Sequence, residues 1–238
     1  MITALVKNVK YAARNQMGSH RASFGALAVN STFRRRMVHP DYDVTIDGFP
    51  RSSNSYAYQA FVRFNPGARV AHHLHAPMQI LLSVEYGVPC LLLVRRPLDA
   101  LSSTLIVDST LRDDVAVGSW IDFHRRVLPV VPEIVVADFA EVTSDFPSVV
   151  HRVNVRYGTA FEEGAVDDVV HAEIRDHLER HHTEHGQPAH LVAVPTPEKE
   201  AAKALVRERL VALPLLAEAD RLYDALLAAR RACGPPPG

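Results

Sequence analysis

The sequence predicts an α/β fold with three layers, in which a mostly parallel central sheet lies between two layers of helices and further helices follow at the C-terminal end. Short runs of apolar and β-branched residues alternate with segments whose apolar residues recur every three or four positions. Strands that alternate with helices at this spacing form parallel sheets covered on both faces. The length of 238 residues suits one such domain with its own core.

The expected elements follow one another in a regular order along the middle of the chain. Strands are predicted where an apolar run is short and bounded by Gly, Pro or polar residues, namely over residues 43–49, 68–74, 88–94 and 133–137. Helices are predicted over residues 54–64, 77–86 and 98–106, around the apolar face of Trp120, Phe123 and Val127, and from a cap at Ser144 to a stop at Gly158.

The domain is predicted to cover residues 42–232, with a lead-in over residues 1–41 and a flexible, proline-rich tail over residues 233–238. The lead-in contains several arginines and few periodic apolar residues, which indicates a short helix followed by a polar segment. Residues 167–185 predict a charged helix rich in histidine. Residues 198–232 predict one or two helices rich in Ala, Leu and Arg.

Composition and charge exclude several classes of protein. Hydrophobic residues make up 47% and charged residues 22%, which is ordinary for a globular domain and excludes collagen-like and mostly disordered chains. The 26 basic and 27 acidic residues give a net charge of −1, so no overall field attracts nucleic acid or an acidic membrane. We expect no nucleic-acid partner, and any binding of polyanions has to come from a local cluster of charge.

Cysteine content and apolar stretches bear on the compartment. Two cysteines form neither a disulfide framework nor a metal site, and they favour a reducing compartment. The apolar stretches over residues 80–94 and 205–216 are interrupted by charged residues and prolines too early to span a bilayer. The N-terminal residues lack the uninterrupted apolar core of a signal peptide. These patterns predict a cytoplasmic protein with no membrane span.

A polar loop follows the first predicted strand and opens a helix. Backbone N–H groups at such a point face the positive end of the helix dipole and suit an anion. The loop also supplies one guanidinium and several short hydroxyl and amide groups, a set that fits a phosphate better than an apolar ligand. Its sequence is Phe49-Pro50-Arg51-Ser52-Ser53-Asn54-Ser55-Tyr56. The alternative is an ordinary polar turn with a helix cap.

A second cationic segment follows the most apolar strand. Arg95 and Arg96 stand directly after this strand, and Ser103 lies on the helix that follows. Two adjacent guanidiniums at the carboxyl end of a buried strand need partners. One interpretation pairs them with Asp99 or other nearby carboxylates. The other places one of them on a second phosphate, with Ser103 completing the site.

Both segments resemble motifs of the P-loop sulfotransferases, which use 3'-phosphoadenosine 5'-phosphosulfate (PAPS) as sulfuryl donor. Residues 49–56 are similar to their 5'-phosphosulfate loop, in which an aromatic residue, Pro, a basic residue, Ser and Gly precede short polar residues. Residues 95–103 are similar to their 3'-phosphate motif, in which a Ser stands eight positions after an Arg. The resemblance covers about residues 43–158 and favours the soluble, bacterial type of this family.

The resemblance implies the P-loop sulfotransferase fold and a set of donor-binding residues. In this set Arg95 and Ser103 hold the 3'-phosphate, Arg51 also offsets charge on the leaving phosphate, and no metal is required. The residues implied for the 5'-phosphosulfate end are Arg51, Ser52, Ser53, Asn54, Ser55 and Tyr56.

The chain departs from the family pattern at several positions. Ser53 stands where the family has Gly, and a side chain there crowds a ligand or forces a strained φ. Arg96 replaces the usual Asp or Asn. The C-terminal Arg-Lys-Gly motif of cytosolic eukaryotic members is missing, and Lys199 is the nearest basic residue to take its place.

Histidines follow the second predicted strand, in the segment His72-His73-Leu74-His75-Ala76-Pro77. The general base of the family is the His of a Lys-Thr-His-x-Pro segment, which matches His75 and leaves His73 where the Lys stands. In a strand through residue 74, His73 and His75 share a face and His72 points the other way. Imidazole removes a proton from a hydroxyl near neutral pH. We therefore expect His75 to be the base, with His73 as the alternative or as an assisting group.

A later group of histidines lies on the predicted charged helix. Spacing of four puts His177, His181 and His185 on one stripe, beside His182, where a surface metal site is one interpretation. No cysteine or carboxylate outside this helix completes a closed site. Interleaved charged residues favour a solvated helix face instead.

The resemblance thus implies a sulfotransferase that acts on the hydroxyl of a small molecule or saccharide. Three alternatives remain open at this point. They are a sulfotransferase-like protein that binds the nucleotide without catalysis, a P-loop phosphotransferase, and a histidine-dependent metal-binding module. The missing Gly-x4-Gly-Lys-Ser/Thr pattern argues against the second of these.

Overall fold

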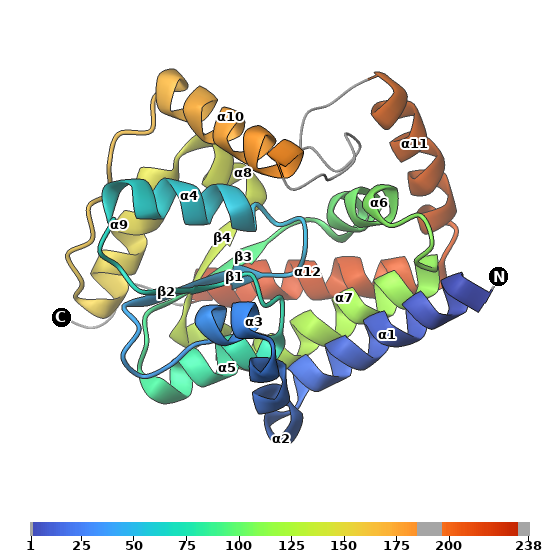
Figure 1. Cartoon of the computed structure of the whole chain (residues 1–238), viewed down its shortest axis with the longest axis horizontal. Helices are drawn as coiled ribbons and strands as arrows, with labels where there is room; N and C mark the ends of the chain where they lie inside the picture. Colours follow the sequence, from blue (N-terminus) through green and yellow to red (C-terminus); the bar gives the residue numbers. More distant parts are fainter. Residues whose placement is uncertain (1, 185–196, 233–238) are drawn as a thin grey trace.

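The structure is a computed structural model that describes residues 2–184 and 197–232 (Figure 1). Its sheet has four strands, all parallel, in the order β2-β1-β3-β4. The strands are β1 (Val44–Gly48), β2 (Val70–His72), β3 (Cys90–Val94) and β4 (Val135–Asp138). The predicted α/β class with a parallel sheet is confirmed.

Helices connect the strands and extend the chain beyond them. Those between β1 and β4 are α4 (Asn54–Phe64), α5 (Pro77–Tyr86), α6 (Pro97–Val107) and α7 (Asp113–Val127), with a 3-10 turn over Leu128–Glu133. Those after β4 are α8 (Phe139–Ser144), α9 (Phe146–Tyr157), α10 (Asp168–Glu184), α11 (Pro197–Val211) and α12 (Pro214–Ala232). No helix in the described part of the chain is long and apolar enough to cross a membrane.

The predicted cap at Ser144 is wrong. Ser144 ends the short helix α8, and its hydroxyl donates to the carbonyl of Ala140 at 2.8 Å. The next residue, Asp145, caps α9 instead, because its carboxylate accepts the N–H of Ser148 at 3.3 Å. A carboxylate at this position also interacts favourably with the helix dipole.

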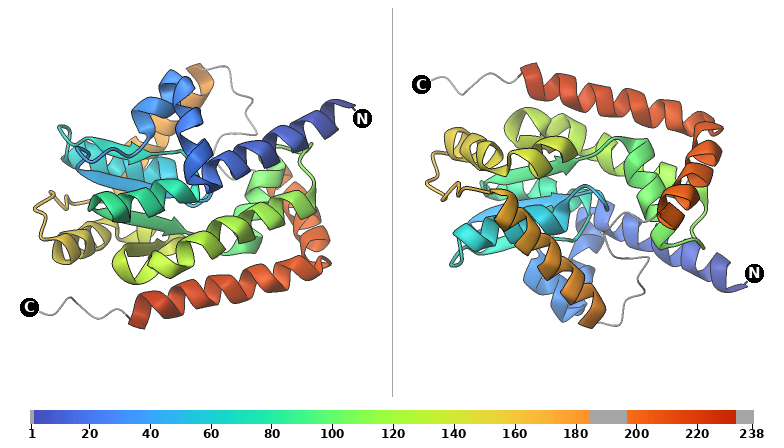
Figure 2. Two further views of the ribbon diagram at one scale, coloured as in Figure 1. Left: turned by 90° about the horizontal axis from the view of Figure 1, so that it is seen from below. Right: turned by 90° about the horizontal axis from the view of Figure 1, so that it is seen from above.

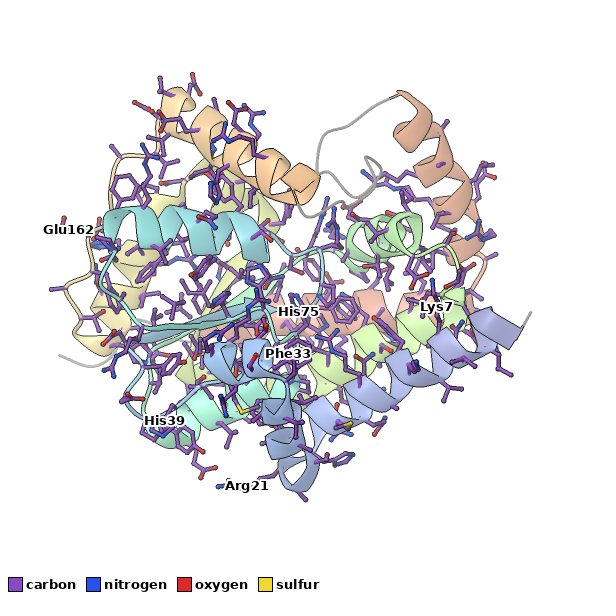
Figure 3. All side chains as sticks on the ribbon, in the orientation of Figure 1. Lys7, Arg21, Phe33, His39, His75 and Glu162 are labelled. Carbon is purple, nitrogen blue, oxygen red and sulfur yellow. The ribbon has the colours of Figure 1, made fainter. Side chains whose placement is uncertain are left out.

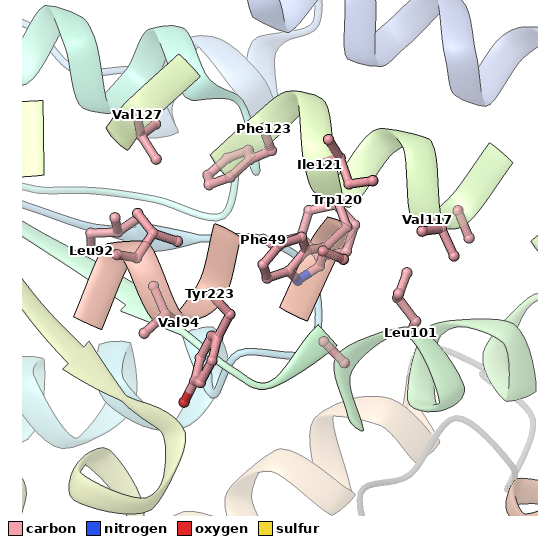
Figure 4. Close-up of a cluster of buried hydrophobic side chains, with 14 of the residues drawn as sticks. Phe49, Leu92, Val94, Leu101, Val117, Trp120, Ile121, Phe123, Val127 and Tyr223 are labelled. Carbon is pink, nitrogen blue, oxygen red and sulfur yellow. The ribbon is translucent and has the colours of Figure 1, made fainter. Parts of the chain in front are cut away.

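Both faces of the sheet are buried under helices, as the three-layer prediction requires (Figures 1 and 2). Alternate residues of β3 enter different cores: Leu92 packs with Phe49 and Trp120 under α5, α6, α7 and α12, whereas Leu93 packs with Phe61 under α4, α8 and α9. Figure 4 shows the first of these cores. Strands buried on both faces are continuous apolar runs, which is why β3 was predicted from its sequence.

The carboxyl ends of the strands meet at one edge of the sheet. Ile46 pairs with His72, Gly48 with Leu93, and Val94 with Asp138. Gly48 is required at the end of β1, since a Cβ there would lie 2.1 Å from the carbonyl oxygen of Leu93. This edge carries the loops that the sequence singled out.

The first forty residues differ from the predicted short helix and polar lead-in. They form α1 (Ile2–Ser19), α2 (Arg21–Phe24), a 3-10 turn (Gly25–Val29) and α3 (Ser31–Arg36). Helix α1 packs on α7 through polar contacts: Asn15 donates to Ser119 at 3.0 Å and Ser19 to Asp122 at 3.0 Å. Because Asn and Ser make part of this packed face, it gives only a weak apolar period in the sequence.

Candidate functional site at the carboxyl edge of the sheet

The loop between β1 and α4 has a backbone that is rare for its residue types. Arg51 and Ser53 have φ of 70° and 68°, in the left-handed region that favours glycine. Left-handed residues in a turn direct successive backbone N–H groups toward a common point, and the free N–H groups of the first turn of α4 lie beside them. This backbone conformation is of the kind that anion-binding turns have.

Polar atoms in this loop are buried without partners. Among the described residues, Ser52 Oγ, Ser53 Oγ and Asn54 Oδ1 are inaccessible to solvent and make no hydrogen bond. The amide nitrogen of Asn54 donates to the Phe49 carbonyl at 3.0 Å, which fixes its oxygen in place. Buried polar groups are nearly always hydrogen-bonded in folded proteins. Three orphaned atoms in one loop indicate a polar ligand.

The two cationic segments predicted to bind phosphate contact each other directly. Arg51 Nε donates to Ser103 Oγ at 2.9 Å, and Arg95 donates to the backbone carbonyl of Arg51 at 3.0 Å. The Arg95 guanidinium also lies 3.8 Å from the ring centre of Phe139, a cation–π contact. The structure therefore brings Arg51, Arg95 and Ser103 together, although Ser103 contacts Arg51 and not Arg95.

Neither arginine has a carboxylate partner. Within the described residues Arg51 and Arg95 form no ion pair, and Asp99, the partner weighed for Arg95, is paired with Arg207 of α11. Burial lowers the pKa of both guanidiniums, because removal from water penalises the charged form. For Arg95 the carboxylates of Asp99 and Asp138 offset part of this effect without forming a direct ion pair. Partly buried cations with no direct ion pair are costly. An anionic ligand would supply the missing charge.

The histidine segment leaves the sheet earlier than predicted. Strand β2 ends at His72, and His73 and His75 each have φ of 54°, so the expected alternation of side chains along a strand is wrong. The buried carboxylate of Asp47 on β1 is the reason. It accepts the backbone N–H groups of Leu74 at 2.8 Å and His75 at 3.2 Å, which bends the chain toward β1.

His73 uses both ring nitrogens within the protein. Its Nε2 lies 3.0 Å from Ser55 Oγ and its Nδ1 lies 2.7 Å from Nδ1 of His72. Burial, with smaller contributions from the neighbouring His75 and His72, lowers the pKa of His73 to about 3. His73 is therefore a neutral residue that links the histidine segment to the first turn of α4.

His75 is held at one nitrogen and open at the other. Its Nδ1 donates a hydrogen bond to the carbonyl of Gly48 at 2.7 Å. The same nitrogen lies 3.4 Å from Oδ1 of Asp47. This bond places the proton on Nδ1 and leaves the lone pair on Nε2, which makes no hydrogen bond within the described residues. A ring fixed at Nδ1 with a lone pair at Nε2 is the geometry that a general base requires.

Asp47 supports this arrangement as a buried anion. Burial raises the pKa of its carboxyl group, but the hydrogen bond from His75, electrostatic interactions with the His75 and His73 imidazoles, and the Gly48 N–H together outweigh burial and lower the pKa. The Gly48 N–H donates to Oδ1 at 2.8 Å. Sequence reasoning missed Asp47. The available signal was a carboxylate inside the short predicted strand, two residues before the polar loop that begins at Phe49.

The remaining predicted residues have other surroundings. Tyr56 is buried against Phe146, and its hydroxyl lies 2.7 Å from Nδ1 of His171 on α10, a partner that the sequence did not suggest. Burial raises the pKa of Tyr56 to about 12. His177 is exposed on α10. The structure does not describe the side chains of the rest of the predicted histidine group or of the lysine proposed for the C-terminal motif. These residues are His181, His182, His185 and Lys199. No group of three potential metal ligands occurs among the described residues.

Backbone strain is concentrated at this edge. In the described part of the chain, every left-handed residue other than glycine belongs to one of the two loops: Arg51, Ser53, His73 and His75. A left-handed conformation costs a non-glycine residue about 1–2 kcal/mol. Such strain persists where the surrounding structure enforces it, and it clusters at ligand sites.

Replacement of Ser53 by Gly should stabilise the protein by about 0.5–1 kcal/mol. The substitution removes the left-handed strain and one orphaned hydroxyl, and the extra freedom of glycine in the unfolded chain offsets part of the gain. Urea unfolding measures the change. Ser52→Gly is the matched control, since Ser52 is not left-handed, and it should destabilise. A loss of stability in Ser53→Gly would show that the loop is not strained at this residue.

Comparison of the chain with family models, with curated proteins and with solved structures finds no match. The functional interpretation therefore depends on the geometry of this edge and on the motifs that form it.

Proposed function

We propose that the protein is a sulfotransferase that transfers the sulfuryl group of PAPS to a hydroxyl of an acceptor, with His75 as general base. One observation carries the proposal. The two arginine motifs and the histidine segment, which lie far apart in the sequence, are joined at one edge by direct bonds from Arg51 to Ser103, from Arg95 to the Arg51 carbonyl, and from His75 to the Gly48 carbonyl. Ligands of parallel α/β sheets bind at this edge.

The chemistry of the residues fits a donor with two anionic ends. The backbone N–H groups of the β1–α4 loop, with the guanidinium of Arg51 and the hydroxyls of Ser52 and Ser55, would hold the 5'-phosphosulfate. The guanidinium of Arg95 would hold the 3'-phosphate. Hydrogen bonds to such a ligand would satisfy the orphaned hydroxyls of Ser52 and Ser53. The donor would also give each guanidinium a direct ion pair, which neither forms within the described residues.

The base is the second part of the proposal. When bound, PAPS supplies an electrophilic sulfuryl group. His75 accepts the proton of the acceptor hydroxyl at Nε2, while the Gly48 carbonyl and the Asp47 carboxylate orient the ring and stabilise its positive charge. Arg51 offsets the negative charge that develops on the leaving phosphate. Positioning and electrostatics of this kind supply most of the acceleration in the analogous phosphoryl transfers.

The loop disfavours a nucleoside triphosphate as ligand. Phosphate-binding loops of nucleotide kinases contain a Lys followed by Ser or Thr, whose side chains reach the β- and γ-phosphates and the magnesium ion. The present loop has Asn54 and Ser55 at its end and contains no Lys. Its cations are two guanidiniums, which suit the separate phosphates of a 3',5'-substituted adenosine.

A transfer assay tests the proposal. The protein is incubated with PAPS labelled in its sulfuryl group and with a panel of alcohols, phenols and saccharides, and labelled product and adenosine 3',5'-bisphosphate are measured together. We expect equal amounts of both, formed without ATP. Nucleotide binding with no transfer to any acceptor would favour a non-catalytic binding protein. Magnesium-dependent hydrolysis of ATP would favour a phosphotransferase.

A further inference from the structure

The first half of helix α1 presents three large apolar residues to solvent. The packed side of α1 includes Asn15, which bonds Ser119 of α7, Asn8, which bonds the segment just before α7, and Tyr11, which packs on the core. Leu5, Val6 and Val9 are 64%, 44% and 59% exposed. Figure 2 shows α1 at the outside of the molecule, with α7 between it and α12. A surface helix of a globular domain normally has the opposite arrangement. Contiguous exposed apolar residues of this kind mark an interaction surface.

The same segment is strongly basic. Residues 1–40 contain no Asp or Glu, although the net charge of the whole chain is −1. Among the described residues, Arg21 is the only Lys or Arg of this segment that forms an ion pair, and its partner is Glu85 of α5. Figure 3 shows Lys7 and Arg21 at separate points along these helices. The basic residues of the segment are Lys7, Lys10, Arg14, Arg21, Arg34, Arg35 and Arg36.

From this combination we infer that α1 and the basic segment around it form a docking surface for an anionic lipid bilayer. A helix with exposed apolar residues and adjacent lysines lies in the plane of the interface, with its apolar side in the headgroup region. The basic residues add attraction to anionic headgroups, about 1 kcal/mol for each one near the surface. The bilayer is the occupant that uses both features of this surface at once.

Two other occupants fit the surface less well. A second copy of the chain would bring the same seven positive charges against the first, and like charges across an interface are unfavourable. A soluble polyanion, such as nucleic acid or a sulfated polysaccharide, would use the basic residues and leave Leu5, Val6 and Val9 in water. Asp122 of α7 is an acidic residue that contacts α1. Its carboxylate accepts hydrogen bonds from Ser19 and Arg126 on the packed side of the helix.

The docking surface is connected to the candidate site. Near the end of α1, a Cβ on Gly18 would lie 2.8 Å from the Cβ of Ala76, which shows how closely α1 approaches the histidine segment. Arg14 of α1 also donates to the carbonyl of Leu74 at 3.4 Å. A bilayer seated on α1 would therefore contact the helix that supports the residues on either side of His75.

Vesicle co-sedimentation tests the inference without donor or acceptor, so its result does not depend on the proposed function. The full chain is mixed with vesicles of phosphatidylcholine, alone or with phosphatidylserine. We expect binding only to the mixed vesicles, weakened by salt. Val6→Gln with Val9→Gln should reduce binding about tenfold or more. The double variant Lys7→Gln with Lys10→Gln should also weaken vesicle binding, by about fivefold for each lysine that contacts the headgroups.

Matched controls decide between the occupants. Val155 on α9 and Val169 on α10 are similarly exposed, and their double Gln variant should bind vesicles as the wild type does. Circular dichroism confirms that each variant is folded. Absence of binding to phosphatidylserine vesicles would overturn the inference, as would binding that is unchanged in the Val6/Val9 variant. Self-association that is lost in that variant would identify a second copy as the occupant, and binding to heparin alone would identify a soluble polyanion.

Discussion

His75→Asn should reduce sulfuryl transfer by about 10²- to 10⁴-fold and leave the affinity for adenosine 3',5'-bisphosphate within about twofold. The substitution removes the lone pair at Nε2, the atom proposed to take the acceptor proton. Asn tolerates the left-handed φ of 54° and offers a side-chain amide to the Gly48 carbonyl, so the loop is retained. Initial rates with labelled donor and calorimetry with the bisphosphate measure the two effects separately.

His73→Asn is the control for the base. Both nitrogens of His73 are engaged, one of them with Ser55 in the first turn of α4. We therefore expect its loss to weaken nucleotide binding more than the transfer step. If His73→Asn removed transfer with binding intact while His75→Asn remained active, the roles of the two histidines would be reversed. Loss of binding in His75→Asn would mean that His75 only supports the fold.

Acid should destabilise the protein strongly between pH 6.5 and 3. Burial is the main cause that lowers the pKa of His72, His73 and His124 to about 3, from an ordinary value of 6.5. Above pH 6.5 these residues are neutral in both states and stability is unaffected. Below it the unfolded chain takes up protons that the folded chain does not, so stability falls. At pH 5 each fully buried histidine costs about 2 kcal/mol, and the three together about 4–6 kcal/mol once solvent screening of His72 and His73 is allowed for.

A loss of this size is comparable to the whole stability of an ordinary domain. Urea unfolding at pH 7 and pH 5 measures it. His124 stacks on Trp120 with 3.7 Å between ring centres. The variant His124→Phe should reduce the loss in the free energy of unfolding between pH 7 and pH 5 by about 2 kcal/mol, whatever its effect on stability at pH 7. The control is His20, which is exposed. Its variant His20→Gln should leave the change in the free energy of unfolding between pH 7 and pH 5 as in the wild type. Equal stability of the wild type at both pH values would contradict the neutral, buried state of these histidines.

The core of the fold could be predicted from the sequence because its signals are local. Strand β3 is a continuous apolar run ended by arginines, and α5 begins at Pro77 and ends before Gly87, where periodicity and end signals agree. The N-terminal helices could not be predicted in this way. The side of α1 that packs on α7 includes Asn15 and Ser19, whose contacts are with residues about one hundred positions away.

The candidate site was predictable in part for the same reason. The loop of Arg51 and the segment of Arg95 each follow an apolar strand, so a parallel sheet places them at one edge. The geometry of the histidines was not predictable. It depends on Asp47, which bonds the backbone of Leu74 and His75 across the sheet and ends β2 at His72. A long-range bond from a single buried carboxylate leaves no periodic trace in the sequence.

Binding of adenosine 3',5'-bisphosphate, measured by calorimetry on the wild type and two arginine variants, tests most directly whether this edge is a nucleotide site. Arg95 bonds the Arg51 carbonyl and has no carboxylate partner in the described chain, whereas its neighbour Arg96 is exposed and lies over the ring of Tyr223. We expect the wild type to bind, Arg95→Gln to lose about tenfold or more in affinity, and Arg96→Gln to bind within about twofold of the wild type. Failure of the wild type to bind, or an equal loss in both variants, would contradict the proposed donor site.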